Sequence, residues 1–282
     1  MAHPVVRAGR LFMVSTPIGH LGDFSFRGVE VLRQVALIAA EDTRHTRRLL
    51  THYEIAARLI SIHAHTRVEE IERLLDRVEH GEDVAYVTDA GTPGVSDPGG
   101  LIAERAHRRG ITVVPVPGPA AVLAALTAAG FPADRFLFLG FLPRRGTGRA
   151  ELLEQIAASA WTCVCYEAPG RTAALLRDLA ARCGDSRAAA VARELTKIHE
   201  EVRRGTLGEL AAYYEAHAPR GEVTVVVGAR PRQEVVAAEP APDADHLVAE
   251  LRGSGPPAAV AKELAKRLRI SRQEAYRLLT RA

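Results

Sequence analysis

A loop rich in glycine and proline is the part of this sequence best suited to binding a ligand. Residues 89–100 (DAGTPGVSDPGG) contain four glycines and two prolines, which shape tight turns and expose backbone N–H and C=O groups. An ordinary strand–helix turn needs only two or three such residues, so we interpret the segment as a ligand cradle. It has neither a Gly-Lys-Ser/Thr sequence nor a GxGxxG pattern, which argues against a nucleotide-phosphate loop and an ordinary dinucleotide site.

Charged and hydroxyl side chains are concentrated in three further segments. Residues 40–47 (AEDTRHTR) combine two carboxylates, a histidine and two arginines. A solvated helix start capped by Asp42 or Thr43 would explain them, but their density favours a role that faces a substrate. Residues 166–171 (YEAPGR) and 193–197 (RELTK) supply the polar groups that an interdomain cleft would need. No Ser-His-Asp or Cys-His signature and no metal-ligand spacing is present, so we predict no metal site.

The elements that must position these segments alternate between strand and helix. Residues 67–79 have helical spacing, and apolar runs of strand length occupy residues 11–16, 36–40, 59–62, 84–88, 112–115 and 136–139. This alternation predicts an N-terminal α/β domain over residues 1–140, with parallel strands and functional loops at their carboxyl ends. A second α/β domain is predicted over residues 141–230. Its elements are a helix ending near 159, strands 162–166, 188–193 and 223–227, and helices 171–183 and 207–217.

The C-terminal part of the chain differs in composition and charge. Residues 231–243 are rich in Pro, Glu and Ala and predict a linker. Residues 244–282 predict a basic helical appendage, with a helix at 260–268 and a capping box formed by Ser271 and Glu274. The appendage holds eight Lys and Arg against four Asp and Glu, whereas the whole chain has a net charge of +3. Such a surface could bind an acidic partner.

Composition narrows the class of protein. The chain has 282 residues, of which 47% are hydrophobic and 25% charged, so it is neither disordered nor of low complexity. Three cysteines without a ligand cluster indicate reduced thiols of a cytosolic protein. The uncharged residues 110–133 contain prolines at 115, 117 and 119, so we predict a strand, a turn and a buried helix there. We therefore expect a soluble cytoplasmic protein with no membrane contact.

The motifs and their order closely resemble those of the ribosomal RNA small-subunit methyltransferase I family, within the tetrapyrrole methylases (class III S-adenosylmethionine enzymes). The resemblance runs from about residue 10 to 230, and more loosely over the C-terminal unit. Its motifs are residues 15–23 (STPIGHLGD), 39–47 (AAEDTRHTR), 86–99 (YVTDAGTPGVSDPG), 116–121 (VPGPAA), 138–145 (FLGFLPRR), 166–171 (YEAPGR) and 193–197 (RELTK).

The resemblance implies two α/β domains of tetrapyrrole-methylase type, with S-adenosylmethionine held in a cleft between them, and a homodimer. The implied reaction is 2′-O-methylation of a cytidine ribose in the decoding region of 16S ribosomal RNA, within the 30S subunit. The family's cofactor contacts map onto Asp89, Gly91, Val95, Ser96, Ala120, Ala121, Tyr166, Glu167, Leu195 and Thr224. Ala120 stands where relatives commonly have serine, so a hydroxyl contact is absent at that position.

The implied chemistry needs a group that activates a ribose hydroxyl, a poor nucleophile at neutral pH. Asp42 and His45 are candidate bases, Glu194 is a weaker candidate, and Lys197 could act either as a base or as a cation that lowers the hydroxyl pKa. RNA also requires phosphate neutralisation, for which Arg44, Arg47, Arg144, Arg145, Lys266 and Arg269 are candidates. The basic appendage could equally pack on a dimer partner.

Two other functions are compatible with these motifs. One is a small-molecule methylase on the same fold, acting on a tetrapyrrole or a comparable acceptor. The other is a ribosome-binding factor that keeps the cofactor fold without catalysis. The TPIG sequence in residues 15–23, the EDTRHTR segment and the basic appendage favour the RNA enzyme, because small-molecule relatives more usually have a GxGPG form in the first loop.

Overall fold

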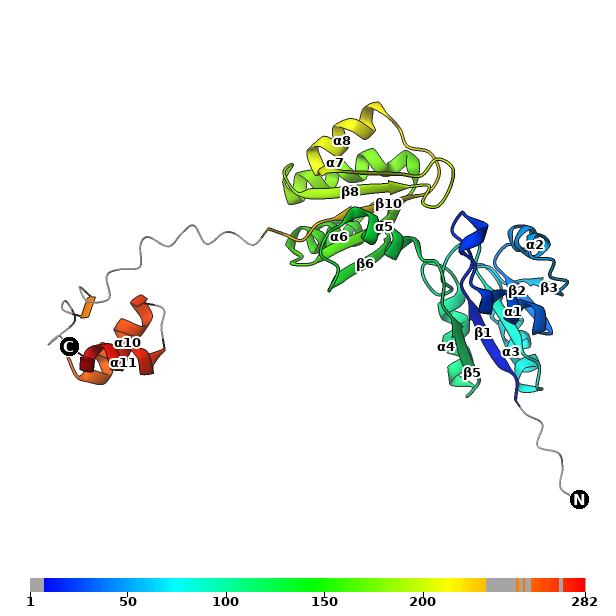
Figure 1. Cartoon of the computed structure of the whole chain (residues 1–282), viewed down its shortest axis with the longest axis horizontal. Helices are drawn as coiled ribbons and strands as arrows, with labels where there is room; N and C mark the ends of the chain where they lie inside the picture. Colours follow the sequence, from blue (N-terminus) through cyan, green and yellow to red (C-terminus); the bar gives the residue numbers. More distant parts are fainter. Residues whose placement is uncertain (1–7, 232–246, 249–250, 252–254, 269–270, 282) are drawn as a thin grey trace, which may run out of the picture. The chain divides into compact units, whose positions relative to one another are not determined.

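A computed structural model describes residues 8–231, 247–248, 251, 255–268 and 271–281. The chain divides into two compact units, Met1–Arg230 and Pro231–Ala282. The first unit contains two lobes, each built on a five-stranded sheet (Figure 1). None of the described helices is long and apolar enough to span a membrane.

The first lobe is a parallel sheet covered by helices on both faces. Its strands, in the order β3-β2-β4-β1-β5, are β1 (Arg10–Val14), β2 (Leu37–Ala40), β3 (Leu59–Ser61), β4 (Val84–Val87) and β5 (Thr112–Val116). Its helices are α1 (Phe26–Gln34), α2 (Thr43–His52), α3 (Val68–Glu79) and α4 (Gly99–Arg108). Because α3 and α4 pack on one face and α1 and α2 on the other, the strands are buried on both sides. Every first-lobe strand thus matches a predicted strand to within two residues at either end.

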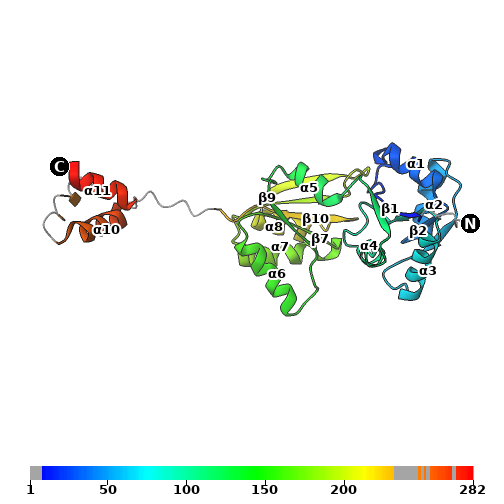
Figure 2. The same ribbon diagram turned by 90° about the horizontal axis from the view of Figure 1, so that it is seen from below.

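The second lobe is a mixed sheet in the order β6-β7-β10-β8-β9, with only β6 and β7 parallel. Its strands are β6 (Phe136–Phe141), β7 (Thr162–Glu167), β8 (Ala188–Arg193), β9 (Glu201–Thr206) and β10 (Val223–Val227). Its helices are α5 (Ala121–Ala129), α6 (Thr147–Ala158), α7 (Thr172–Cys183) and α8 (Leu207–Ala216). Side chains of α6, α7 and α8 pack on one face, and α5 covers the other (Figure 2).

Two features of the second lobe differ from the sequence prediction. The sequence analysis places β6 and α5 in the N-terminal domain, residues 1–140. In the structure both belong to the second lobe, because β6 pairs with β7 and α5 packs on Val164, Ala190 and Val226. The division at residue 140 therefore falls inside the second sheet. Strand β9 was not predicted, since its sequence (EVRRGT) has no apolar alternation and it pairs only along β8, at the sheet edge.

The C-terminal unit has a small core of its own. Helices α10 (Pro257–Leu268) and α11 (Arg272–Arg281) pack together through Val260, Leu264 and Ala275. The predicted capping box is confirmed: Ser271 Oγ accepts from the Glu274 N–H at 3.2 Å, and a Glu274 carboxylate oxygen accepts from the Ser271 N–H at 3.1 Å. Lys266 is exposed on α10. The predicted linker 231–243, except Pro231, and Arg269 lie outside the described residues.

Candidate functional site

The loops singled out in the sequence lie at facing ends of the two sheets. In the first lobe they follow the carboxyl ends of the parallel strands β1, β2 and β4. In the second lobe, Val223 at the start of β10 pairs with both Glu167 and Arg193, the last residues of β7 and β8. The YEAPGR and RELTK segments therefore begin at one end of the second sheet.

Internal hydrogen bonds hold the glycine loop in a fixed shape. The Asp97 carboxylate accepts from the N–H groups of Gly94 at 2.9 Å and Gly99 at 2.6 Å. Thr16 and Gly91 exchange two backbone hydrogen bonds of 2.9 and 3.1 Å, which join the loops after β1 and β4. Ser96 has a backbone φ of +67°, a left-handed conformation that is unusual for a residue other than glycine. The loop is thus preorganised.

A cavity of about 320 Å³ lies between the glycine loop and the second lobe. It is lined by nine of the ten residues to which the resemblance assigned cofactor contacts: Asp89, Gly91, Val95, Ser96, Ala120, Ala121, Tyr166, Glu167 and Thr224. Leu195 is absent from the lining; it belongs to the hydrophobic cluster that includes Ile18 and Val122 and is 8% exposed. We call this space the first cavity.

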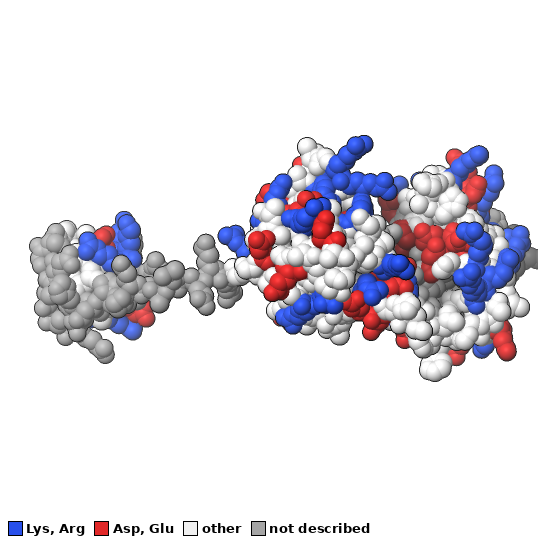
Figure 3. Space-filling view, turned by 90° about the horizontal axis from the view of Figure 1, so that it is seen from above, with Lys and Arg blue, Asp and Glu red and all other residues white. Residues whose placement is uncertain are grey.

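Carboxylates give the first cavity a negative character. Glu41, Asp89, Asp97, Glu167 and Glu222 all line it. Figure 3 shows acidic side chains gathered in the hollow between the two lobes. Burial, together with the charge of Glu41, raises the pKa of Asp89 and of Asp97, although hydrogen bonds from backbone N–H groups oppose the shift. A cationic ligand would relieve this crowding of negative charge.

One carboxylate oxygen in the wall of the first cavity has no partner. The Glu167 side chain is fully buried; its Oε1 accepts from the Ala168 N–H at 2.7 Å and pairs with Arg171. Its Oε2 is buried without a hydrogen-bond partner among the described residues. Because an unpaired buried carboxylate oxygen is costly, this atom is an acceptor available to a ligand donor after a small movement.

A second cavity, of about 310 Å³, adjoins the first. The two share Ile18, Thr88, Asp89, Ala90 and Glu222 as lining residues, which form a common wall. His45, Arg48 and Lys197 line the second cavity and not the first, together with apolar residues such as Leu21 and Leu49. Two of the three candidate catalytic residues, His45 and Lys197, therefore lie beside the predicted cofactor residues.

Asp42, the third candidate, has a different environment. Its carboxylate caps α2 by accepting from the Arg44 N–H at 2.8 Å, and it pairs with the Arg44 guanidinium at 2.7 Å. These hydrogen bonds hold the pKa of Asp42 far below its ordinary range. A carboxylate so strongly stabilised is a weak base, and Asp42 lines neither cavity. Its geometry fits a helix cap better than a proton acceptor.

The RELTK loop of the second lobe contacts the first lobe. Thr196 Oγ1 accepts from the His20 N–H at 3.0 Å, and a Cβ on Gly19 would lie 2.5 Å from Lys197 Cγ. Only a glycine at position 19 therefore allows this close approach. Local sequence patterns do not reveal this contact, because it joins residues more than 170 positions apart. It places Lys197 against the first-lobe loop that follows β1.

Glycine at position 221 makes room for the Glu194 side chain, and we expect Gly221→Ala to destabilise the protein. A Cβ there would lie 2.0 Å from Glu194 Oε1, so the carboxylate would have to leave its partners, Lys197 and the Glu222 N–H. Losing these hydrogen bonds costs about 1–3 kcal/mol, and the φ of +78° adds a backbone cost of about 1–2 kcal/mol for an L residue.

Chemical denaturation of Gly221→Ala beside Gly110→Ala measures this effect. Gly110 also has a positive φ, +69°, but a Cβ there would meet nothing within 4 Å. The control should lose only the backbone contribution, about 1–2 kcal/mol. Equal losses of unfolding free energy in the two variants would contradict the tight packing of Glu194 against Gly221.

The candidate RNA contacts are spread over the surface. Arg44 and Arg47 are exposed on α2. Together with Arg48, which also lines the second cavity, they line a shallow hollow. Arg144 and Arg145 are exposed between β6 and α6 and line neither cavity. The arginines of α2 are therefore the candidate contacts that the structure brings to the site.

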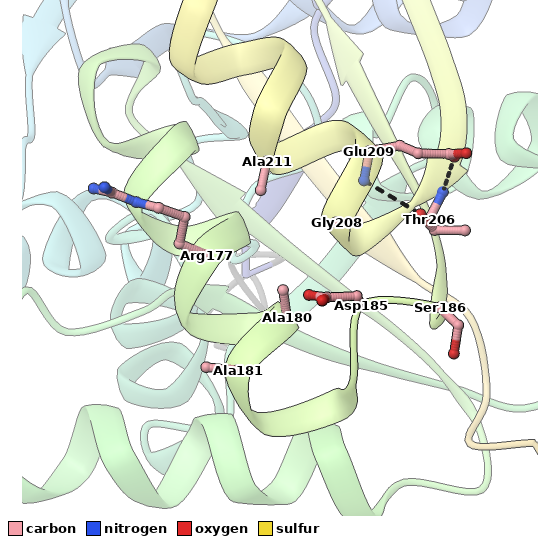
Figure 4. A pocket seen from close by; sticks show the side chains of 9 residues that line it. All are labelled: Arg177, Ala180, Ala181, Asp185, Ser186, Thr206, Gly208, Glu209 and Ala211. Atoms are coloured by element: carbon pink, nitrogen blue, oxygen red, sulfur yellow. Dashed lines mark hydrogen bonds between the residues drawn. The ribbon is translucent and has the colours of Figure 1, made fainter.

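A further hollow lies between α7 and α8, away from all these motifs (Figure 4). Small side chains, including Ala180, Ala181 and Ala211, form its floor beside Gly208. The hydrogen bonds drawn there belong to the capping box of α8, between Thr206 and Glu209. None of the predicted site residues lines this hollow.

Comparison with known proteins finds a matching family model and similar sequences. The family model described as Tetrapyrrole (Corrin/Porphyrin) Methylases matches residues 10–211. The chain is 42% identical over 275 residues to "Ribosomal RNA small subunit methyltransferase I" of Synechocystis sp., covering 96% of this chain and 97% of that protein. The protein of the same name from Pseudomonas aeruginosa is 46% identical over 249 residues, covering 86% of this chain and 88% of that protein.

Solved structures share the fold. Uroporphyrin-III C-methyl transferase from Thermus thermophilus, complexed with S-adenyl homocysteine, aligns with a TM-score of 0.55 at 21% identity. The alignment covers 78% of this chain and 97% of that chain. Together with the family model, this likeness confirms the predicted tetrapyrrole-methylase fold.

Proposed function

Because the chain belongs to the tetrapyrrole methylase family, and within it to the group of ribosomal RNA small subunit methyltransferase I, we propose that it uses S-adenosylmethionine to methylate the RNA of the small ribosomal subunit. The observation that carries this proposal is the pair of adjoining cavities. One has the residues expected of a methyl-donor site, and the other has the residues expected of a nucleophile's site.

The residues of the first cavity fit the cofactor. When bound, S-adenosylmethionine supplies a methyl group on a positively charged sulfonium sulfur. The carboxylates of the wall complement that charge, and the unpaired Glu167 Oε2 offers an acceptor to a ligand hydroxyl or ammonium group. Apolar residues such as Val95, Ala121 and Phe141 suit the flat face of an adenine.

The second cavity fits the acceptor sugar. We propose that His45 takes the proton of the acceptor hydroxyl as that oxygen gains the methyl carbon, whose bond to the donor sulfur would break to leave a neutral thioether. Lys197 stabilises the negative charge that develops on the oxygen. Arg48, with Arg44 and Arg47 of the same helix, would neutralise the flanking phosphates. Methyl transfer requires direct contact between the acceptor oxygen and the methyl carbon, so we propose that the two cavities open into each other along their shared lining residues.

The finer assignment rests on the resemblance of the motifs. We propose that the acceptor is the ribose 2′-oxygen of a cytidine in the decoding region of 16S ribosomal RNA, within the 30S subunit. A homodimer, a cytoplasmic location and RNA contacts from Arg144, Arg145, Lys266 and Arg269 are parts of the same proposal.

Transfer of a labelled methyl group tests the proposed function. The full chain is incubated with methyl-labelled cofactor and, in separate reactions, with assembled 30S subunits, naked 16S RNA and a porphyrinoid. We expect label in the RNA, recovered on nuclease digestion as a 2′-O-methylated cytidine. Label in the porphyrinoid alone would identify a small-molecule methylase, and no transfer despite ribosome binding would identify a non-catalytic factor.

A further inference from the structure

The chain uses lysine very sparingly, and one of its lysines is in the second cavity. Of the 37 lysines and arginines, three are lysines: Lys197, Lys262 and Lys266. The last two are in the C-terminal unit, so Lys197 is the single lysine of residues 1–230. Arginine is the other long-chain cation throughout residues 1–230, so position 197 stands out by carrying an ammonium with three N–H donors.

Two carboxylates hold the Lys197 ammonium group. Its Nζ lies 2.9 Å from Glu194 Oε1 and 3.3 Å from Glu222 Oε2. An ammonium is a compact charge with three N–H donors, so two of them can face carboxylates while the third serves a ligand. A guanidinium would keep the positive charge but spread its donors in a planar fork, so an arginine should serve this arrangement in part. Since Glu222 lines both cavities, the ammonium lies beside the shared wall.

Glu194 is itself fixed from several directions. Its Oε1 accepts from the Glu222 N–H at 3.0 Å, and its own N–H donates to the Glu222 carbonyl at 3.0 Å. Glu194 and Thr196 have φ values of +49° and +64°, so two residues of this short loop adopt the left-handed conformation without being glycine. Backbone strain of this kind persists only where the surroundings impose it, and it is frequent at functional sites.

We propose that Glu194 is a positioning residue of the acceptor site and holds the Lys197 ammonium beside the residues that line both cavities. Lys197 then serves the acceptor sugar as a fixed cation and not as a base. This inference rests on the proposed function. It chooses between the two roles, base or cation, that the sequence analysis leaves open for Lys197. Glu194 acts through Lys197 and does not contact the substrate.

The surrounding charges agree with a cationic Lys197. Burial lowers the pKa of Lys197, but the hydrogen bond with Glu194 and the charge of Glu222 outweigh burial, and the net shift is upward. The other charged or titratable groups that line the second cavity are His45 and Arg48 from α2 and Asp89 from the loop after β4. An ammonium held between carboxylates keeps its proton at neutral pH, so the hydroxyl proton has to go to another group, for which His45 is the candidate.

Titration of the lysine side chains tests the positioning directly and needs neither cofactor nor RNA. Selective labelling of the full chain gives three lysine side-chain signals by NMR, and Lys→Arg variants assign them. The Lys197 midpoint should lie above the ordinary value of about 10.4 and should fall in Glu194→Gln. Glu215→Gln, which removes an exposed carboxylate paired with Arg177 on α7, should leave it unchanged. A midpoint below the ordinary value, or one that Glu194→Gln does not move, would overturn the proposal.

Kinetics with 30S subunits then shows whether Lys197 acts as a cation or as a base. Lys197→Arg keeps the charge but cannot accept a proton, so it should retain at least tenfold more kcat than Lys197→Met. Glu194→Gln should lower kcat about tenfold or more while the Kd for S-adenosylhomocysteine stays within threefold. Equal inactivity of Lys197→Arg and Lys197→Met would indicate a base and refute the fixed cation. If the wild-type chain methylates no RNA, the proposed function fails, whereas the NMR titration still decides whether Glu194 positions Lys197.

Discussion

Replacing Ala121 with phenylalanine is expected to weaken the binding of S-adenosylhomocysteine at least 100-fold and to abolish methyl transfer. Ala121 is the first residue of α5 and lines the first cavity, whose volume is about 320 Å³. An aromatic ring at this position occupies space that the cofactor needs, and a 100-fold loss corresponds to about 2.7 kcal/mol. Isothermal titration calorimetry measures the change in Kd.

Leu123→Phe provides the matched control for this prediction. Leu123 is on the same helix but is 53% exposed and lines neither cavity. Its substitution should leave the Kd within about twofold and the methylation rate nearly unchanged. If Ala121→Phe bound the cofactor product as tightly as Leu123→Phe does, the first cavity would not be the cofactor site.

Replacing His45 with glutamine is expected to lower kcat about 100-fold or more, because general-base catalysis contributes about 10²–10⁴ to the rate of reactions that need it. His45 lines the second cavity and not the first, so the Kd for S-adenosylhomocysteine should remain close to that of the wild type. Single-turnover methylation of 30S subunits measures the chemical step without a contribution from product release.

His52→Gln controls for the loss of a histidine from the same helix. His52 is the last residue of α2, is exposed, and lines only the shallow hollow formed by the α2 arginines. We expect a rate within about threefold of the wild type for this variant. A rate for His45→Gln equal to that of His52→Gln would remove His45 from the mechanism.

Much of the fold follows from local patterns in the sequence. The strands β8 and β10 coincide with the predicted ranges, because each is an apolar run bounded by turn residues. Strand β9 could not be predicted, since its residues are polar and pairing with β8 alone defines it. The assignment of β6 to the second sheet depends on which apolar faces meet, which periodicity does not record.

The candidate site, like the fold, can be predicted from the sequence only in part. The glycine loop and the YEAPGR segment were predicted to bind a ligand, and both line the first cavity. Glu41 and Glu222 were not predicted, although both contribute to its charge. Glu41 could have been suspected from the density of charge in residues 40–47, whereas Glu222 gains its position only when the second lobe docks on the first. Leu195 differs from the other nine predicted cofactor residues, because it belongs to a hydrophobic cluster with Ile18 and Val122 and does not line the first cavity.

The central claim is that a methyl donor in the first cavity and an acceptor in the second meet where the two cavities join, beside their shared lining residues. A crystal structure of the full chain with S-adenosylhomocysteine tests it most directly. We predict electron density for the ligand among Asp89, Ala121 and Glu167, with its sulfur turned towards the wall formed by Ile18 and Thr88, and the cavity around His45 and Lys197 left open. Density in the second cavity, or a sulfur directed away from the shared wall, would contradict the account.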